Sequence, residues 1–519
     1  MTIPARFGQV AGKYSRVAMP TSAISRFTTA SSGLREGSMK DLKGRAIRGG
    51  VAKVCAQAAN VLLRMGSLMI LARLLKPMDF GLVGMATVIT GVLSLFKEFG
   101  LSTATVQRLT IRDEQISTLF WINMFVGAIL SLASVAIAPF VADFYHEPRL
   151  SMVMVVLASG FLFNAAGVQH SALLQRQMRF TALAMIDVLS LVISSAVSIV
   201  MALRGHGYWA LVAWSVTLPL ASTLLTWLQS GWIPGRPRAQ TGIRSMMRFG
   251  GTLTLNSLVC YVAYNLDKVL LGRFWGAEVI GIYGRAYQLI TLPTDNLNAA
   301  AGGVGFPVLS RLQDDPERLR SYFLKAYSLI VALIVPVTVV CALFADDLIL
   351  VLLGPNWNDA VPLFRLLAPT ILIFALINPP GWFLLSLGMV GRSLRIALVI
   401  APLVMTGYVI GLPYGPKGVA LGYSAAMTLW VVPHLVWCFH GTVVSFRDVV
   451  LVVSRPMISG IVGASLAFGV VFFVGPSLSA VARLLLGGTV LIAVYILVLL
   501  FFMGQKTLCL DLLRGFRRH

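Results

Sequence analysis

Apolar segments of about 20 residues recur along the whole of this chain, and each is long enough to cross the roughly 30 Å hydrocarbon core of a bilayer as a helix. Their approximate cores are 50–72, 79–96, 116–141, 151–172, 181–203, 207–229, 249–271, 279–306, 326–345, 362–387, 393–412, 417–438, 454–474 and 484–503. Only helices or closed barrels satisfy the backbone in lipid, and these runs are too long and continuous for barrel strands. Only 12% of the residues are charged, about half the share found in soluble proteins. The sequence therefore predicts an all-α integral membrane protein with about 14 transmembrane helices.

Basic residues are distributed unevenly among the predicted loops. The formal net charge is +22, and the excess lies in short loops between apolar runs, which favours anionic lipid headgroups rather than nucleic acid as the partner. With the N-terminus placed in the cytosol, about 30 Lys and Arg fall on the cytosolic side and about 8 on the other. This bias predicts that both termini are cytosolic.

The chain contains an internal repeat with a period of about 200 residues. Ungapped superposition pairs Arg48 with Arg248, Gly50 with Gly250, Arg73 with Arg273, Gly81 with Gly281, Gly84 with Gly284 and Ala86 with Ala286. Six predicted spans separate the copies, an even number, so both copies have the same orientation, with a pseudo-two-fold axis along the membrane normal. The copies differ in charge, because Asp267 and Arg285 of the second occupy the positions of Ser67 and Met85 in the first.

The repeat predicts a division of the chain into six parts. These are a basic, disordered cytosolic tail (1–47), an N-terminal six-helix bundle (48–230), a cytosolic linker (231–247), a C-terminal six-helix bundle (248–440), two additional helices (441–505) and a basic cytosolic tail (506–519). The first tail is Arg- and Ser-rich with few acidic residues, a composition that also fits a mitochondrial transit peptide. Met39 is an alternative start, because a short basic lead into the first span follows it.

Ionisable residues inside predicted spans are functional candidates, since each costs at least about 2.5–3.5 kcal/mol to insert. They are Arg64, Asp187, Asp267, Lys268, Arg285, Asp295 and His434. Asp267 and Lys268 are adjacent and point about 100° apart, so they cannot both face one groove. Structural alternatives remain open: Arg64 can pair with Asp187 to hold the first bundle together, Asp295 can lie in a broken, water-lined turn after Pro293, and His434 can be a buried structural histidine.

The chain shows none of the patterns that carry catalysis or cofactors. It has no nucleophile elbow or phosphate-binding loop, and its five cysteines have no metal-ligand spacing. We therefore expect no enzyme activity, no cofactor and no metal.

Two blocks of sequence resemble a known family. The first reads ARLLKPMDFGLVGMATVITGVLSLFKEFGLSTATVQR, and the second reads NLDKVLLGRFWGAEVIGIYGRAYQLITLP, followed by FPVLSRLQDDPERLRSYFLKAY. Together they resemble the polysaccharide transporter family, the Wzx-type flippases of the multidrug/oligosaccharidyl-lipid/polysaccharide exporter superfamily. The resemblance implies two six-helix bundles plus two helices. It also implies an undecaprenyl-diphosphate-linked oligosaccharide as cargo, turned across the bacterial inner membrane. Polysaccharide polymerase and chain-length or export proteins would be the partners.

The intramembrane charges suit such a cargo. Arg64, Lys268 and Arg285 are the candidate substrate-binding residues, because guanidinium groups match phosphate oxygens. Asp187, Asp267 and Asp295 are the candidate ion-coupling residues. Arg285 and Asp267 have the strongest claim, and we expect both to face an aqueous cavity between the bundles.

Other functions fit the same fold. A multidrug or cation antiporter of the same superfamily would need an acidic cavity, whereas the charges here are mixed. A peptidoglycan lipid II flippase would share the fold and the basic cavity, and a structural scaffold would have no need of buried charges.

Overall fold

The computed structural model describes residues 56–97, 113–237 and 243–504. Within these ranges the chain forms helices and short connections, without any β-strand. The predicted tails at 1–47 and 506–519, and the alternative start at Met39, lie outside the described residues.

The helices follow the apolar runs closely. A helix at 56–74 comes first, and the others are α2 (Pro77–Ser94), α4 (Asp113–Tyr145), α5 (Arg149–Arg176), α6 (Phe180–Leu203), α7 (Trp209–Ser230), α8 (Ile243–Arg311), α9 (Pro316–Leu343), α10 (Ala345–Leu352), α11 (Ala360–Leu367), α12 (Pro369–Ser386), α13 (Val390–Gly411), α14 (Gly415–Phe439), α15 (Phe446–Val474) and α16 (Ala480–Leu497). Within the described residues, ten segments are long and apolar enough to cross a membrane, and one of them, Val390–Phe439, contains both α13 and α14. The all-α membrane fold is confirmed, and the count of fourteen spans stays a prediction.

Local sequence fixes several helix ends. Pro77 occupies the start of α2, where its missing N–H costs nothing, and the Asp79 carboxylate accepts a bond from the Lys76 backbone N–H at 3.0 Å. At the start of α15, Ser445 and Asp448 form a reciprocal capping box. These caps satisfy backbone donors that the first turn of a helix leaves unpaired.

The helix α8 consists of two limbs joined at Gly276. This glycine has φ 84° and ψ −178°, a conformation that residues with a Cβ avoid. The two limbs correspond to the predicted spans at 249–271 and 279–306.

The alternative of a broken turn after Pro293 is wrong, because the second limb of α8 stays helical through this residue and Asp295. Proline removes a backbone donor, and nearby side chains that bond to the backbone help a membrane helix to tolerate it. Here the Asn296 side-chain amide donates to the Leu292 carbonyl oxygen at 2.8 Å.

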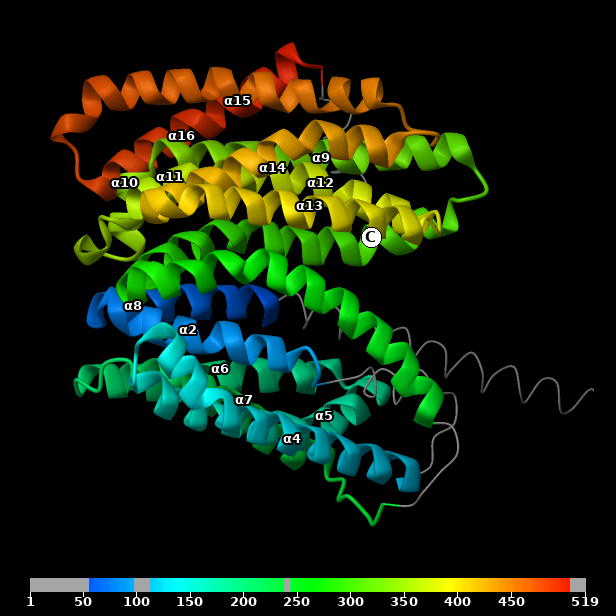
Figure 1. Cartoon of the computed structure of the whole chain (residues 1–519). Coiled ribbons are helices and arrows are strands. Elements are labelled where there is room, and N and C mark those ends of the chain that lie inside the picture. The colour runs from blue at the N-terminus through cyan, green and yellow to red at the C-terminus, as the bar shows by residue number, and fades with distance from the viewer. Residues whose placement is uncertain (1–55, 98–112, 238–242, 505–519) are drawn as a thin grey trace, which may run out of the picture.

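The helices form two groups that face one another (Figure 1). In the first group α4, α5, α6 and α7 pack together, and in the second α9, α11, α12, α13 and α14 pack with α8. The helix α2 lies along α8 and connects the groups. The last two helices pack on each other and against α9, outside the second group.

Ion pairs tie the last two helices to the second group. Arg483 of α16 lies with its Nε 3.0 Å from Asp347 Oδ1 of α10. Arg320 of α9 makes two hydrogen bonds, of 3.1 and 2.7 Å, to the Asp448 carboxylate of α15.

The helices α2 and α8 cross at two glycines that the internal repeat relates, and each glycine faces a carbonyl oxygen of the other helix. A Cβ at Gly81 would lie 1.6 Å from the Ala277 carbonyl oxygen, and a Cβ at Gly281 would lie 1.9 Å from the Pro77 carbonyl oxygen. Pro77 and Ala277 are themselves 200 residues apart, so each half presents the same pair of groups to the other, as a two-fold axis requires. We call this crossing the seam.

Two repeat-related arginines flank the seam with contacts between the groups. Arg73 Nη2 donates to the Val351 carbonyl oxygen of α10 at 2.9 Å. Arg273, its counterpart, bonds to the His146 ring just after α4. Each arginine thus reaches from its own half to the other.

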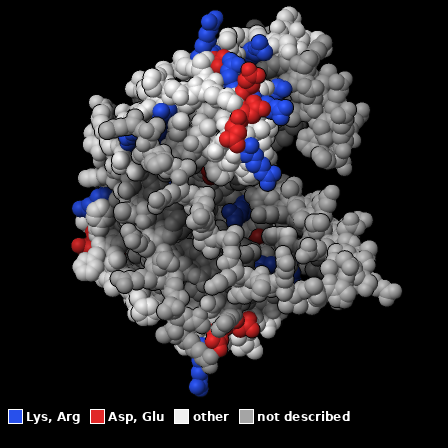
Figure 2. All heavy atoms as spheres, turned by 90° about the vertical axis from the view of Figure 1, so that its right-hand side faces the viewer, with Lys and Arg blue, Asp and Glu red and all other residues white. Residues whose placement is uncertain are grey.

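The seam lies toward one end of the molecule. This end carries α10 and α11 and lies at the left of Figure 1. Figure 2 looks onto the opposite end and shows Lys or Arg side chains in the middle of that view.

Candidate substrate site

Arg285 lies at the centre of the candidate site, on the second limb of α8. Its guanidinium carbon lies over the Phe80 ring of α2, 4.5 Å from the ring centroid, and its Nη1 donates to the Gln288 side-chain oxygen. A cation over an aromatic face keeps its outward-facing donors available for a ligand. The same guanidinium lines two neighbouring cavities.

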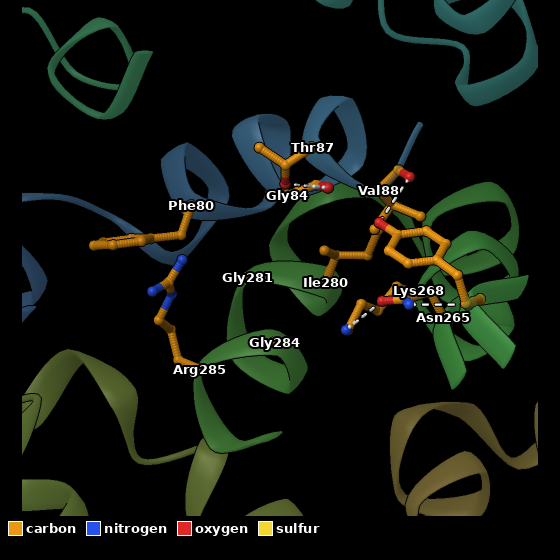
Figure 3. Close-up of a pocket in the computed structure, with 11 residues that line it drawn as sticks. Phe80, Gly84, Thr87, Val88, Asn265, Lys268, Ile280, Gly281, Gly284 and Arg285 are labelled. Carbon is orange, nitrogen blue, oxygen red and sulfur yellow. Dashed lines mark hydrogen bonds between the residues drawn. The ribbon is translucent and has the colours of Figure 1, made fainter. Parts of the chain in front are cut away.

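The first cavity, which we call the Lys268 cavity, has a volume of about 300 Å³ and lies where α2 meets both limbs of α8 (Figure 3). Lys268 Nζ donates to Asn265 Oδ1 at 2.8 Å and lies 4.8 Å from the centre of the Tyr287 ring. The Tyr261 hydroxyl donates to the Val88 carbonyl oxygen at 3.1 Å. The walls thus supply a cation, an amide and a hydroxyl.

The second cavity, which we call the Arg64 cavity, also has a volume of about 300 Å³. The 56–74 helix, α2, α6, α7 and α8 line it, and Arg64 and Arg285 contribute to its wall. Within the described part of the chain, Arg64, Lys268 and Arg285 form no ion pair. Cations without carboxylate partners around two adjoining cavities are suited to an anionic ligand.

Asp267 does not face either cavity, contrary to the expectation from the sequence. Its side chain is fully buried, at 0% exposure, and it accepts hydrogen bonds of 2.8 Å from the Tyr283 hydroxyl and from the Lys268 backbone N–H. Adjacent helical residues point to different sides, so Lys268 reaches the cavity while Asp267 points into the second group. Arg285 has other partners, and the two residues form no ion pair.

A cluster of tyrosines surrounds this carboxylate, and sequence reasoning missed it. Tyr283 stacks with Tyr287 at 6.2 Å between ring centres, Tyr287 contacts Tyr423 at 6.1 Å, and Tyr423 stacks with Tyr408 at 5.5 Å. The spacing of Tyr283 and Tyr287, four residues apart on one helix face, was the available signal.

The remaining ionisable residues lie elsewhere. Asp187 on α6 and Asp295 on α8 are both exposed, and neither lines the two cavities. His434 is 7% exposed, and its Nε2 lies 3.1 Å from the Ile377 carbonyl oxygen. The expected burial of His434 is therefore confirmed, although its Nδ1 has no hydrogen-bond partner among the described residues.

Helical halves related by a pseudo-two-fold axis, with cavities lined by basic residues between them, are typical of a membrane transporter fold. The family model described as "Polysaccharide biosynthesis protein" matches residues 70–362, more than half of the chain. The chain belongs to this family.

Several proteins of known role are similar in sequence. "Lipopolysaccharide biosynthesis protein WzxC" of Escherichia coli K12 is 27% identical over 381 residues, which cover 72% of this chain and 77% of that protein. "Teichuronic acid biosynthesis protein TuaB" of Bacillus subtilis 168 is 29% identical, over 56% of this chain and 61% of that protein. "Succinoglycan biosynthesis transport protein ExoT" of Rhizobium meliloti 1021 is 24% identical, over 62% and 65% respectively.

Two solved structures share the fold. Lipid II flippase MurJ in an inward closed conformation superposes with a TM-score of 0.68 at 11% identity, covering 89% of this chain and all of that chain. A multidrug resistance transporter of the MATE family, in an inward-facing conformation, gives 0.56 at 16% identity, covering 73% and 94%. At these identities the likeness concerns the fold alone.

Proposed function

We propose that this protein is a transporter, and not an enzyme, that moves an undecaprenyl-diphosphate-linked oligosaccharide across the bacterial inner membrane for exopolysaccharide or lipopolysaccharide synthesis, such as O-antigen or capsule. The observation that carries the proposal is the position of Arg285, a cation without a carboxylate partner that lines both cavities next to the seam. The similar proteins act in polysaccharide biosynthesis, which supports this cargo over an organic cation.

The diphosphate is the group that most needs protein contacts, because its charges cannot enter hydrocarbon unaided. Arg285 offers a planar fork to its oxygens, while Lys268 and Arg64 add charge from the two sides. Because Arg285 lines both cavities, a diphosphate held there would lie between Lys268 of one cavity and Arg64 of the other. Alternating access of the two halves would then carry the headgroup from one leaflet to the other.

Asp267 is our proposed coupling residue. Its buried carboxylate accepts hydrogen bonds from one hydroxyl and one backbone N–H. Such a group can bind a proton while it is buried and release the proton when its surroundings become more polar. Asp187 and Asp295 are weaker candidates for this role, because both are exposed on helix surfaces.

We propose that the end opposite the seam faces the cytosol and that the seam lies on the periplasmic side, with both termini cytosolic. The moving bodies would be the bundles at 48–230 and 248–440. Reporter fusions test this orientation: fusions after Arg318 and His519 should report a cytosolic position, and fusions after Glu147 and Asp359 a periplasmic one. A periplasmic signal from the His519 fusion would overturn the proposed orientation.

Two measurements test the function itself. A deletion strain should accumulate an undecaprenyl-diphosphate-linked oligosaccharide on the cytosolic leaflet and lose one exopolysaccharide while staying viable. Loss of viability would favour a lipid II flippase, and altered resistance to cationic drugs would favour an antiporter.

In proteoliposomes, Arg285→Ala should reduce lipid-linked oligosaccharide translocation by about 10- to 100-fold, because charge-assisted bonds contribute about 1.5–3 kcal/mol each. Arg285→Lys should restore part of the rate, since a point charge replaces a fork. Arg204→Ala, at an exposed position outside both cavities, is the matched control. Equal rates for Arg285→Ala and the control would remove Arg285 from the site.

A further inference from the structure

The Arg64 cavity has a mixed lining. Leu68, Leu71 and Leu211 give it apolar surface, and Arg285 and Arg64 give it charge. A simple anion site would not need apolar surface beside its cations. The cavity therefore has the character of a site for a group that is polar at its edges and apolar on a face.

Trp214 of α7 adds a flat surface to the apolar part of this lining. Its side chain is partly buried and lines the cavity. Its indole N–H has no hydrogen-bond acceptor among the residues that the structure describes. A buried or interfacial tryptophan usually pairs this donor, so an unpaired one beside a cavity is available to a ligand.

Two polar side chains next to Trp214 complete a set of donors and acceptors. The Gln288 oxygen accepts from Arg285, which directs the other end of the amide, with its two N–H donors, away from the guanidinium. The Ser215 hydroxyl donates to the Leu211 carbonyl oxygen at 3.0 Å, which leaves its oxygen free to accept. Sugar hydroxyls need both kinds of partner.

We propose that the Arg64 cavity holds the sugar ring attached to the diphosphate, with its C–H face on Trp214 and its hydroxyls on Gln288 and Ser215. The proposal rests on the proposed function and deepens it, because Arg285 lines the same cavity and would hold the adjoining phosphate. A volume of about 300 Å³ is at the lower end for ligand pockets. It suits one ring, while the rest of the oligosaccharide would lie outside this cavity.

The test compares two probes on the full-length protein in nanodiscs. These are undecaprenyl diphosphate and undecaprenyl-diphosphate-linked monosaccharides, presented as a panel of glucose, galactose and N-acetylglucosamine. The wild type should bind at least one glycosylated probe about tenfold more tightly than the sugar-free lipid, the size of a good aromatic contact. Trp214→Leu should abolish that preference with the affinity for sugar-free lipid unchanged, and Trp214→Phe should keep part of it.

The control is Phe125→Leu, which removes an aromatic ring from an exposed position on α4 and should leave the preference intact. Equal wild-type affinity for all probes would overturn the sugar site while leaving the transporter proposal standing. The sugar site would also be overturned if Trp214→Leu weakened the binding of every probe to the same extent. That result would mean that Trp214 contacts an isoprenoid unit or has a packing role. A wild type that binds neither lipid would overturn the proposed function itself.

Discussion

The two halves of this protein have the same backbone contacts at the seam but different side chains beside it. Gly81 and Gly281 occupy equivalent positions, and each faces a carbonyl oxygen of the other half. Two positions further along, the first half has Val83 where the second has Tyr283. The Ser67 hydroxyl, at the position of Asp267, lies 2.9 Å from the Ser195 hydroxyl of α6.

This difference teaches which positions the repeat constrains. Where backbones touch, only glycine fits, so both copies need it. Where a polar group is buried, each half supplies a partner of its own, Ser195 for Ser67 and Tyr283 for Asp267. Because the partners are internal to each half, the second half can carry charge without disturbing the seam.

The largest effect should come from replacing Arg285 with methionine, the residue that the first half has at the equivalent position, Met85. Arg285→Met should reduce translocation by about 100-fold while membrane abundance stays near the wild-type level, since charge-assisted contacts to the diphosphate are lost. The reverse exchange, Met85→Arg, should instead reduce abundance, because Met85 has 0% exposure and a charge there would be buried. Quantitative blots and translocation assays separate the outcomes. A fall in abundance for Arg285→Met would show that the arginine is structural.

The next largest effect should come from a single methyl group at the seam. Gly281→Ala would place a Cβ against the Pro77 carbonyl oxygen, and the resulting overpacking should cost about 1–3 kcal/mol in the closed state. We expect translocation to fall about tenfold. Gly66→Ala is the control, because a Cβ there meets nothing within 4 Å. If both variants translocate alike, the seam does not close tightly.

Removal of the buried acid should have a smaller effect, on stability. Asp267→Ala leaves the buried Tyr283 hydroxyl without its acceptor and should lower the free energy of unfolding in detergent by about 1–3 kcal/mol. Ser67→Ala, at the equivalent position, should cost about 1 kcal/mol.

Substitution by an isostere separates stability from coupling. Asp267→Asn should keep normal abundance and lose gradient-driven export, because the amide cannot titrate. Export by Asp267→Asn that still responds to an imposed proton gradient would exclude Asp267 as the coupling residue.

The smallest effect should come from the arginines that flank the seam. Arg73→Ala and Arg273→Ala each remove one contact between the halves, worth about 1 kcal/mol at an exposed position. Both should raise the reactivity of thiols placed at the seam by a similar, few-fold factor. A large effect from only one of them would show that the two-fold symmetry does not extend to energetics.

The positions of the helices could be predicted from the sequence, because membrane thickness fixes the length of an apolar run. The run at 181–203 corresponds to α6 at Phe180–Leu203, and the interruption between 271 and 279 contains the kink at Gly276. The rotation of each helix could not be predicted, because a span that is apolar all round does not indicate which side faces its neighbours. This is why the direction of Asp267 was wrong.

The candidate site could be predicted only where it carries charge. Arg64, Lys268 and Arg285 are conspicuous in apolar spans, and all three line the two cavities. Trp214 and Gln288 were missed because an uncharged side chain in a span has a low insertion cost and attracts no attention. Only the three-dimensional structure brings Trp214 of α7 and Gln288 of α8 to one cavity.

The contacts at the seam are of two kinds. At the seam, the glycines place Cα–H groups against carbonyl oxygens, and such contacts are individually weak. Separation of the two halves there would therefore break no strong bond. The arginines at the edge of the seam make stronger contacts between the halves, because Arg73 hydrogen-bonds to the Val351 carbonyl oxygen and Arg273 to the His146 ring. We therefore expect the tightness of the seam and the ease of its opening to depend on different residues.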